Sequence, residues 1–125
     1  MDRVKSMYVP VFTENGVWVY YGAWGSVNAA IERKFKKAKL DIEHIRADDE
    51  RGATWNCYPE HDPIIGVENA LRGLEAIAVL AHEASHAMDF ISKRLGLNDA
   101  SGEFRAHGIA AIVASAGGLV SGGRV

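Results

Sequence analysis

Residues 68–95 read ENALRGLEAIAVLAHEASHAMDFISKRL, and this stretch decides the fold because it is long, periodic and rich in apolar residues. The spacing of the apolar residues predicts a helix from about Glu68 to Leu95. They also surround most of the helix axis, which predicts a helix that is buried on most sides. Gly96 is typical of a helix C-terminus. The apolar positions are Leu71, Leu74, Ile77, Ala78, Val79, Leu80, Ala81, Ala84 and Met88.

Within this helix, residues 82–86 read His-Glu-Ala-Ser-His, which is the HExxH pattern. One helical turn separates His82 from His86, so both imidazoles project to one side and could bind one Zn²⁺. Glu83 flanks that side and could act as the general base toward a water held by the metal. These are the parts of a hydrolytic zinc site. The alternative is that the two histidines are partly buried packing residues beside a chance glutamate.

A catalytic zinc needs a third protein ligand, and the downstream candidates are Asp89, Asp99, Glu103 and His107. A second helix is expected from about Ser101 to Ser115, and Glu103 and His107 are one turn apart on it, so either could face the site. Asp89 follows His86 by three residues and is better placed to accept a hydrogen bond from a ligand imidazole, which would fix the tautomer. The spacing alone leaves Glu103 and His107 open as the third ligand.

HExxH followed by a helix with Glu-x-x-Ala resembles the gluzincin branch of zinc metallopeptidases, and residues 103–106, Glu-Phe-Arg-Ala, match that second motif. Residues 103–113 are also similar to the second helix of the ImmA/IrrE-type peptidases and of small HExxH proteins encoded by phages and prophages. The resemblance covers residues 75–114, and HExxH is its specific part. His107 stands where the ImmA/IrrE pattern often has Asn.

The resemblance implies a zincin-like α+β fold with a buried HExxH helix and a second ligand-bearing helix. It implies zinc-dependent hydrolysis of a peptide or protein substrate, with Glu83 as the general base and His82, His86 and Glu103 as the ligands. An oxyanion-stabilising donor is also needed, and His61 and Tyr58 are candidates because a loop before the active helix could overhang the site. The rival is a non-enzymatic binding or phage assembly protein on the same scaffold, with structural zinc or none. At 125 residues, specificity pockets could require a partner or a homo-oligomer.

The rest of the chain predicts a small, mostly antiparallel sheet. Residues 7–21 read as a β-hairpin with Asn15-Gly16 at its turn, because both residues tolerate positive φ. Pro10 favours an edge strand, since it cannot donate to a ladder. Short strands are expected at 53–58 and 64–67, and either could bind an extended peptide along a sheet edge. Ser26 is the expected N-cap of a helix that extends to about Leu40.

Composition indicates one ordinary globular domain over residues 1–125, with a flexible Gly-rich tail from about residue 117. The net charge of −2 makes nucleic acid an improbable partner. We expect no membrane association, because no apolar run is long enough to span a bilayer. Cys57 is the single cysteine and has no internal disulfide partner, which favours a reducing, cytoplasmic location.

Overall fold

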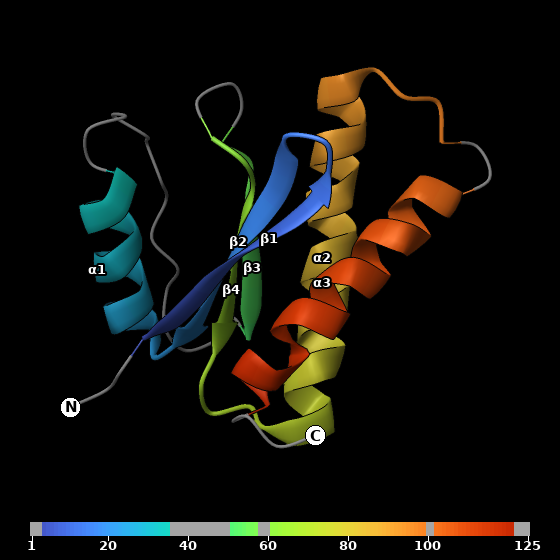
Figure 1. Ribbon diagram of the computed structural model, residues 1–125. Coiled ribbons are helices and arrows are strands. Elements are labelled where there is room, and N and C mark those ends of the chain that lie inside the picture. The colour runs from blue at the N-terminus through green and yellow to red at the C-terminus, as the bar shows by residue number, and fades with distance from the viewer. Residues whose placement is uncertain (1–3, 36–50, 58–60, 100–101, 122–125) are drawn as a thin grey trace.

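A four-stranded mixed sheet lies between one helix on one face and two helices on the other, which makes the fold α+β (Figure 1). The computed structural model describes residues 4–35, 51–57, 61–99 and 102–121. The elements in chain order are β1 (Lys5–Phe12), β2 (Asn15–Gly22), α1 (Trp24–Phe35), β3 (Gly52–Trp55), β4 (Ile64–Glu68), α2 (Gly73–Leu95) and α3 (Glu103–Val120).

The strands are ordered β1-β2-β4-β3 across the sheet. β1 pairs with β2 and β3 with β4 in antiparallel fashion, whereas β2 and β4 run parallel. A parallel pair needs a crossover connection, and α1 lies in it. The sheet is therefore mixed, with two of its three pairings antiparallel as expected. Pro10 lies on edge strand β1, as predicted, but β4 is an internal strand and offers no free edge.

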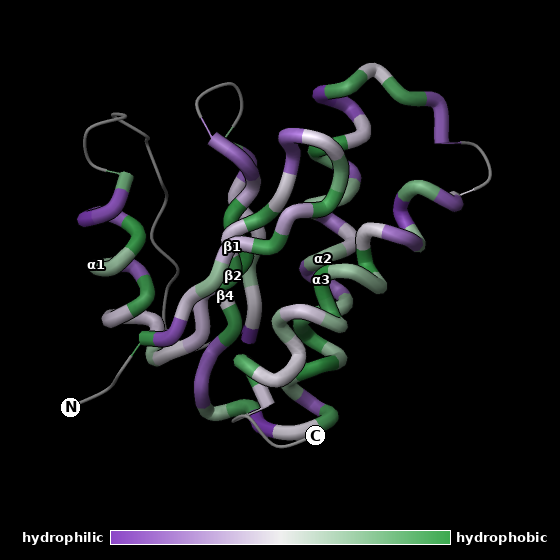
Figure 2. The backbone as a smooth tube through the Cα atoms, viewed as in Figure 1, coloured by the Kyte–Doolittle hydropathy of each residue, from purple (hydrophilic) through white to green (hydrophobic). Residues whose placement is uncertain are grey.

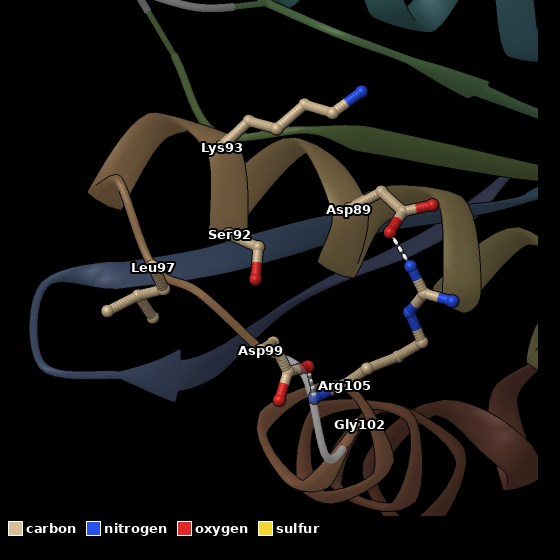
Figure 3. Close-up of a pocket in the computed structure, with 7 residues that line it drawn as sticks. All are labelled: Asp89, Ser92, Lys93, Leu97, Asp99, Gly102 and Arg105. Carbon is tan, nitrogen blue, oxygen red and sulfur yellow. Dashed lines mark hydrogen bonds and ion pairs between the residues drawn. The ribbon is translucent and has the colours of Figure 1, made fainter.

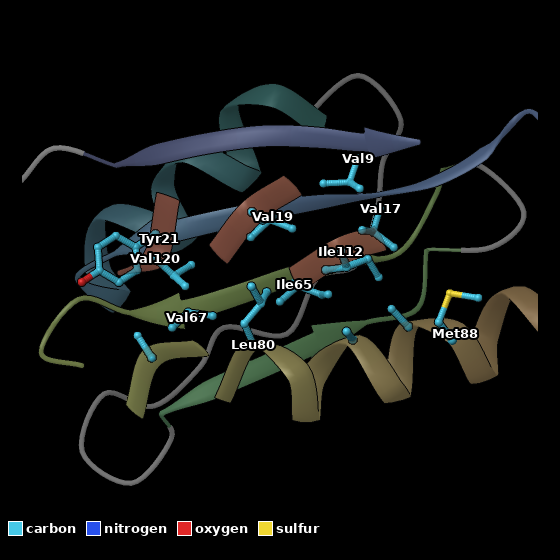
Figure 4. Packing of buried hydrophobic residues seen from close by; sticks show 14 of the residues in the cluster. Val9, Val17, Val19, Tyr21, Ile65, Val67, Leu80, Met88, Ile112 and Val120 are labelled. Carbon is cyan, nitrogen blue, oxygen red and sulfur yellow. The ribbon is translucent and has the colours of Figure 1, made fainter. Parts of the chain in front are cut away.

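Two apolar clusters form because alternate strand residues face opposite sides of the sheet. On one face, strand residues such as Val9, Val19 and Ile65 pack against α2 and α3 (Figure 4). On the other face, Tyr20 and Ile64 pack against α1. α3 carries few hydrophilic residues after its first turns (Figure 2). Among the residues that the structure describes, no helix is long and apolar enough to cross a membrane.

α2 is amphipathic, so the prediction that it would be buried on most sides is wrong. One face packs into the core, and its buried residues are Ala76, Leu80, Glu83, Ala84, Ala87, Met88 and Ile91. On the remaining surface Leu74 is 85% exposed, and His82 and His86 are also exposed. The helix begins at Gly73 rather than near Glu68, because Glu68 is still paired in β4. Gly96 ends it in the left-handed conformation, as predicted.

The hairpin turn lies two residues before the predicted Asn15-Gly16. Phe12 pairs with Asn15, so Thr13 and Glu14 form the turn and Thr13 has a positive φ of 51°. Gly16 is needed inside β2 instead, because a Cβ there would lie only 2.6 Å from the Tyr8 hydroxyl oxygen. Close approach of strands, rather than turn geometry, explains this glycine.

Three other boundaries also differ from the predictions. α1 begins at Trp24, so Ser26 lies inside the helix and is not its N-cap; the predicted extension from residue 36 to 40 falls outside the described residues. β3 ends at Trp55 rather than at residue 58. α3 continues to Val120, so residues 117–120 are helical rather than a flexible tail. The last turn is stabilised because Ala116 and Val120 are buried in the core.

Candidate metal centre

The two histidines of the HExxH pattern form a close pair on the outer surface of α2. Their Nε2 atoms are 3.3 Å apart, and their ring centroids are 4.9 Å apart with the planes at 81°. At about 100° per residue, His82 and His86 lie on the side of the helix opposite Ala84, which is buried. Both rings are exposed. The alternative interpretation of the pair as packing residues is therefore wrong.

The spacing of the pair matches the demands of a tetrahedral metal. Two ring nitrogens that bind one zinc at about 2.0–2.1 Å stand about 3.3–3.4 Å apart. The 3.3 Å between Nε2 of His82 and Nε2 of His86 fits two corners of such a tetrahedron. Neutral imidazole is a suitable ligand for zinc. The donor chemistry and the geometry of this pair therefore both fit a divalent transition metal.

Glu83 points in another direction, toward the sheet. Its side chain is only 8% exposed. The hydroxyl Oγ1 of Thr54 on β3 lies 2.8 Å from Glu83 Oε1, at hydrogen-bonding distance. A Cβ built on Gly52, also on β3, would lie 3.0 Å from Glu83 Cγ. The carboxylate of the motif is thus packed between its own helix and the edge strand, where it has a fixed partner.

The downstream candidates for a third ligand do not join the histidine pair. Glu103 and His107 are 77% and 83% exposed at the start of α3, with Glu103 Oε2 and His107 Nε2 3.8 Å apart. Within residues 4–35, 51–57, 61–99 and 102–121, no group of three His, Cys, Asp or Glu side chains is gathered so that it could hold a metal. The structure therefore brings His82 and His86 together, and their binding of a metal and the identity of a third ligand remain predictions.

Asp89 of α2 is bound by a residue of α3. Its carboxylate forms an ion pair with Arg105, which links the two helices close to His86 (Figure 3). At about 100° per residue it lies on the same outer side of α2 as the histidines. Its predicted role as a hydrogen-bond acceptor for a ligand imidazole would compete with this ion pair.

A pocket of about 450 Å³ lies beside Asp89 at the junction of α2 and α3 (Figure 3). Three of its charged residues already have partners: Asp89 and Arg105 form the ion pair described above, and Asp99 binds backbone groups. The Asp99 carboxylate accepts hydrogen bonds from the backbone N–H groups of Phe104 and Arg105 and so caps α3. The lining residues are Asp89, Ser92, Lys93, Leu97, Asp99, Gly102 and Arg105. The residues that line the pocket therefore link α2 to α3 and cap α3, and their chemistry singles out no ligand.

Of the two candidate oxyanion donors, His61 faces α1. Its ring packs edge-on against Phe35, with 4.8 Å between centroids, and its carbonyl oxygen accepts a hydrogen bond from Arg94. The neighbouring Asp62 carboxylate accepts hydrogen bonds from Arg94 and from Tyr8. This network holds the segment before β4 in place. The other candidate, residue 58, lies outside the described residues.

Tyr8 is the titrating group most changed by this network. Desolvation by burial, followed by its hydrogen bond to the Asp62 carboxylate and the charge of that group, raises the pKa of Tyr8 to about 12. The protonated phenol is the form that donates to Asp62. The hydrogen bond from Tyr8 to Asp62 therefore keeps its donor until the pH approaches about 12.

Thr54 and Gly52 are the site residues that the sequence analysis did not single out. They are two residues apart on one strand and therefore face the same side, which is a sequence signal. Which helix residue they meet depends on how β3 lies against α2, and no local pattern encodes that placement.

Comparisons of the chain with protein-family models, with curated proteins and with solved structures found no match. The resemblance to zinc metallopeptidases therefore depends on the HExxH and Glu-x-x-Ala motifs, and the geometry of α2 is the structural observation that bears on it.

Proposed function

We propose that this chain is a zinc-dependent, HExxH-type hydrolase of peptide bonds on a zincin-like scaffold. The observation that carries the proposal is the 3.3 Å separation of the His82 and His86 Nε2 atoms. Glu83 follows His82 in the chain, and its buried carboxylate has a fixed hydrogen-bond partner on β3. Two neutral nitrogen donors and an adjacent base are what metal-assisted hydrolysis requires of a protein.

Each of these residues has a separate task. His82 and His86 would hold the metal, and zinc bound there would polarise the scissile carbonyl as a Lewis acid. Glu83 would accept the proton of the attacking water and return it to the leaving amine. Because Glu83 is nearly excluded from solvent, its orientation is set by the protein rather than by bulk water.

Glu103 is proposed as the third ligand, with His107 as the alternative. Support comes from the Glu-x-x-Ala motif and from the position of Glu103 in the first turn of the helix that packs beside α2. Glu103 is 77% exposed, so a change of its rotamer toward the histidine pair would lose little buried packing. Measuring the zinc affinity of Glu103→Ala and of His107→Ala separately decides between them.

The substrate we propose is an extended peptide. β3 lies at the sheet edge next to Glu83, and an edge strand can bind an added strand through its backbone groups. A net charge of −2 offers no general attraction for nucleic acid. A cytoplasmic location is part of the proposal, because the single cysteine has no internal disulfide partner.

Metal analysis and a peptide-library digest test the proposal together. We expect about one zinc per chain after purification with zinc present, and cleavage that Glu83→Gln abolishes while the zinc content is unchanged. His86→Ala should lose the zinc, whereas Ser85→Ala, between the two histidines, should keep it. Cleavage that persists in Glu83→Gln would contradict the proposed mechanism.

The rival is a binding or assembly protein in which zinc is structural or absent. It is favoured by one observation, that no third donor joins the histidine pair among the residues described. A structural metal contributes directly to folding. The rival therefore predicts that no peptide in the library is cleaved and that Glu83→Gln changes nothing. Where its zinc is structural, it also predicts that chelation unfolds the protein.

A further inference from the structure

The Glu83 carboxylate is held from the sheet rather than from its own helix. Thr54 Oγ1 is 2.8 Å from Glu83 Oε1 and 3.0 Å from the Glu83 carbonyl oxygen. A hydroxyl has one proton to donate, so Thr54 serves one acceptor at a time. Hydrogen bonds to an ionised acceptor are the stronger ones, and the side-chain carboxylate is therefore the favoured acceptor.

A glycine on the same strand makes this contact possible. Gly52 faces α2 together with Thr54, because the two residues are two positions apart on β3. A Cβ on Gly52 would lie 2.6 Å from Val79 Cγ1 and 3.0 Å from Glu83 Cγ. Any larger residue would require the Val79 and Glu83 side chains to shift or β3 to move away from α2. The close approach of the strand brings the Thr54 hydroxyl within reach of the carboxylate.

We propose that Thr54 is a positioning residue for Glu83. Building on the function proposed above, its hydroxyl fixes the side-chain rotamer of the base before substrate binds. The second carboxylate oxygen, Oε2, lies against Gly52, 3.3 Å from where a Cβ would stand, and is the oxygen left to accept the proton. A free glutamate side chain has appreciable rotamer entropy. Fixing it in advance favours reaction, because a misplaced group costs rate even when it is chemically intact.

A double-mutant cycle in urea unfolding tests the contact without reference to activity. The chains are wild type, Thr54→Val, Glu83→Ala and the double variant. Thr54→Val should lower the folded-to-unfolded ratio about five- to tenfold in the wild-type background. The loss should be clearly smaller in the Glu83→Ala background, because only the hydrogen bond to the backbone carbonyl of residue 83 then remains. An equal loss in both backgrounds overturns the inference, because the hydroxyl would then not act on the carboxylate.

Steady-state kinetics of the zinc-loaded chains test the positioning role, with a pool of quenched-fluorescent peptides as the probe. Under conditions where every chain is folded, Thr54→Val should lower kcat about ten- to a hundredfold with KM nearly unchanged. Thr54→Ser retains the hydroxyl and should restore kcat to within about threefold. Zinc content should be the same in all three chains, since Thr54 does not contact the histidines in any described interaction.

The outcomes separate this inference from the proposed function. If Glu83→Gln abolishes cleavage but Thr54→Val leaves kcat unchanged, the function stands and the positioning role is overturned. If no peptide is cleaved by any chain, or Glu83→Gln cleaves normally, the proposed function fails and the positioning role fails with it. Loss of kcat in Thr54→Val, with rescue by serine and coupling in the cycle, supports the inference.

Discussion

α2 and α3 both carry residues of the candidate metal centre, but they place them by different means. On α2, the Nε2 atoms of His82 and His86 lie 3.3 Å apart because one helical turn separates the two residues. This geometry needs no other part of the protein. On α3, the position of Glu103 relative to that pair depends on how two helices pack. The comparison shows that spacing within one helix is encoded locally, whereas a ligand from a second helix is placed by tertiary contacts.

The largest expected effect comes from the buried side of α2. Leu80 is fully buried, whereas Leu74 on the same helix is 85% exposed. We expect Leu80→Ala to lower the free energy of unfolding by about 2–5 kcal/mol and Leu74→Ala to change it by less than about 0.5 kcal/mol. Urea denaturation of both variants is the measurement. Similar losses in the two variants would contradict an α2 with one buried and one exposed face.

Zinc affinity tests how much the proposed ligands on α2 and on α3 each contribute to metal binding. His86→Ala removes a ligand from the assembled pair and should raise the zinc Kd at least about a hundredfold, since even indirect partners of a ligand are worth about 10–100-fold. By the same argument Glu103→Ala, which removes the proposed third ligand, should raise it by more than about tenfold, and His107→Ala by less than about threefold. Competition titration with a chromogenic chelator gives all three values. A larger effect for His107→Ala than for Glu103→Ala would exchange their roles.

The packing of α3 against α2 is tested at a glycine. A Cβ on Gly108 would meet the Met88 side chain, including its Sδ atom, whereas a Cβ on Gly118 would meet nothing within 4 Å. Gly108→Ala should cost about 1–3 kcal/mol of stability through overpacking. Gly118→Ala should be neutral or stabilise the protein by up to about 1 kcal/mol, because alanine favours the helix. Calorimetry shows whether each variant is less or more stable than the wild type. A more stable Gly108→Ala would contradict the close approach of α3 to α2 at Met88.

Much of the fold follows from sequence periodicity, and the errors have physical causes. Sequence periodicity overestimates the burial of α2, because Leu74 and Ala78 count as apolar in any pattern although both are exposed in the folded chain. The Asn15-Gly16 dipeptide was assigned to the turn because its backbone preference is local. In the folded chain, Gly16 meets a steric demand from the neighbouring strand instead.

In the candidate site, too, contacts within one helix could be predicted from the sequence, whereas contacts between distant segments could not. The sequence alone predicted that His82 and His86 would lie together, and the structure confirms it. It did not predict Thr54 as the partner of Glu83, because that contact joins residues 29 positions apart. Nor could it decide between Glu103 and His107, since their distance from α2 depends on the connection between the helices.

The smallest expected effect concerns the hydrogen bond between Tyr8 and Asp62, which tests the segment that Arg94 of α2 holds in place. The pKa of Tyr8 is raised to about 12, so folding favours the protonated phenol. Its stabilising contribution is complete below about pH 10, the ordinary tyrosine pKa, and is lost as pH rises through about 12. Tyr8→Phe should flatten the alkaline fall in stability, by less than about 1 kcal/mol because Tyr8 is 37% exposed. A pH series of urea denaturation checks this, and an unchanged alkaline slope would contradict the assignment.

The most direct test of the metal centre is anomalous diffraction at the zinc edge from a crystal grown with zinc. The account predicts one strong peak about 2.0–2.1 Å from both Nε2 atoms of His82 and His86, with a carboxylate oxygen of Glu103 as the next protein ligand. A fully zinc-equilibrated crystal with no anomalous peak between the two imidazoles would contradict it.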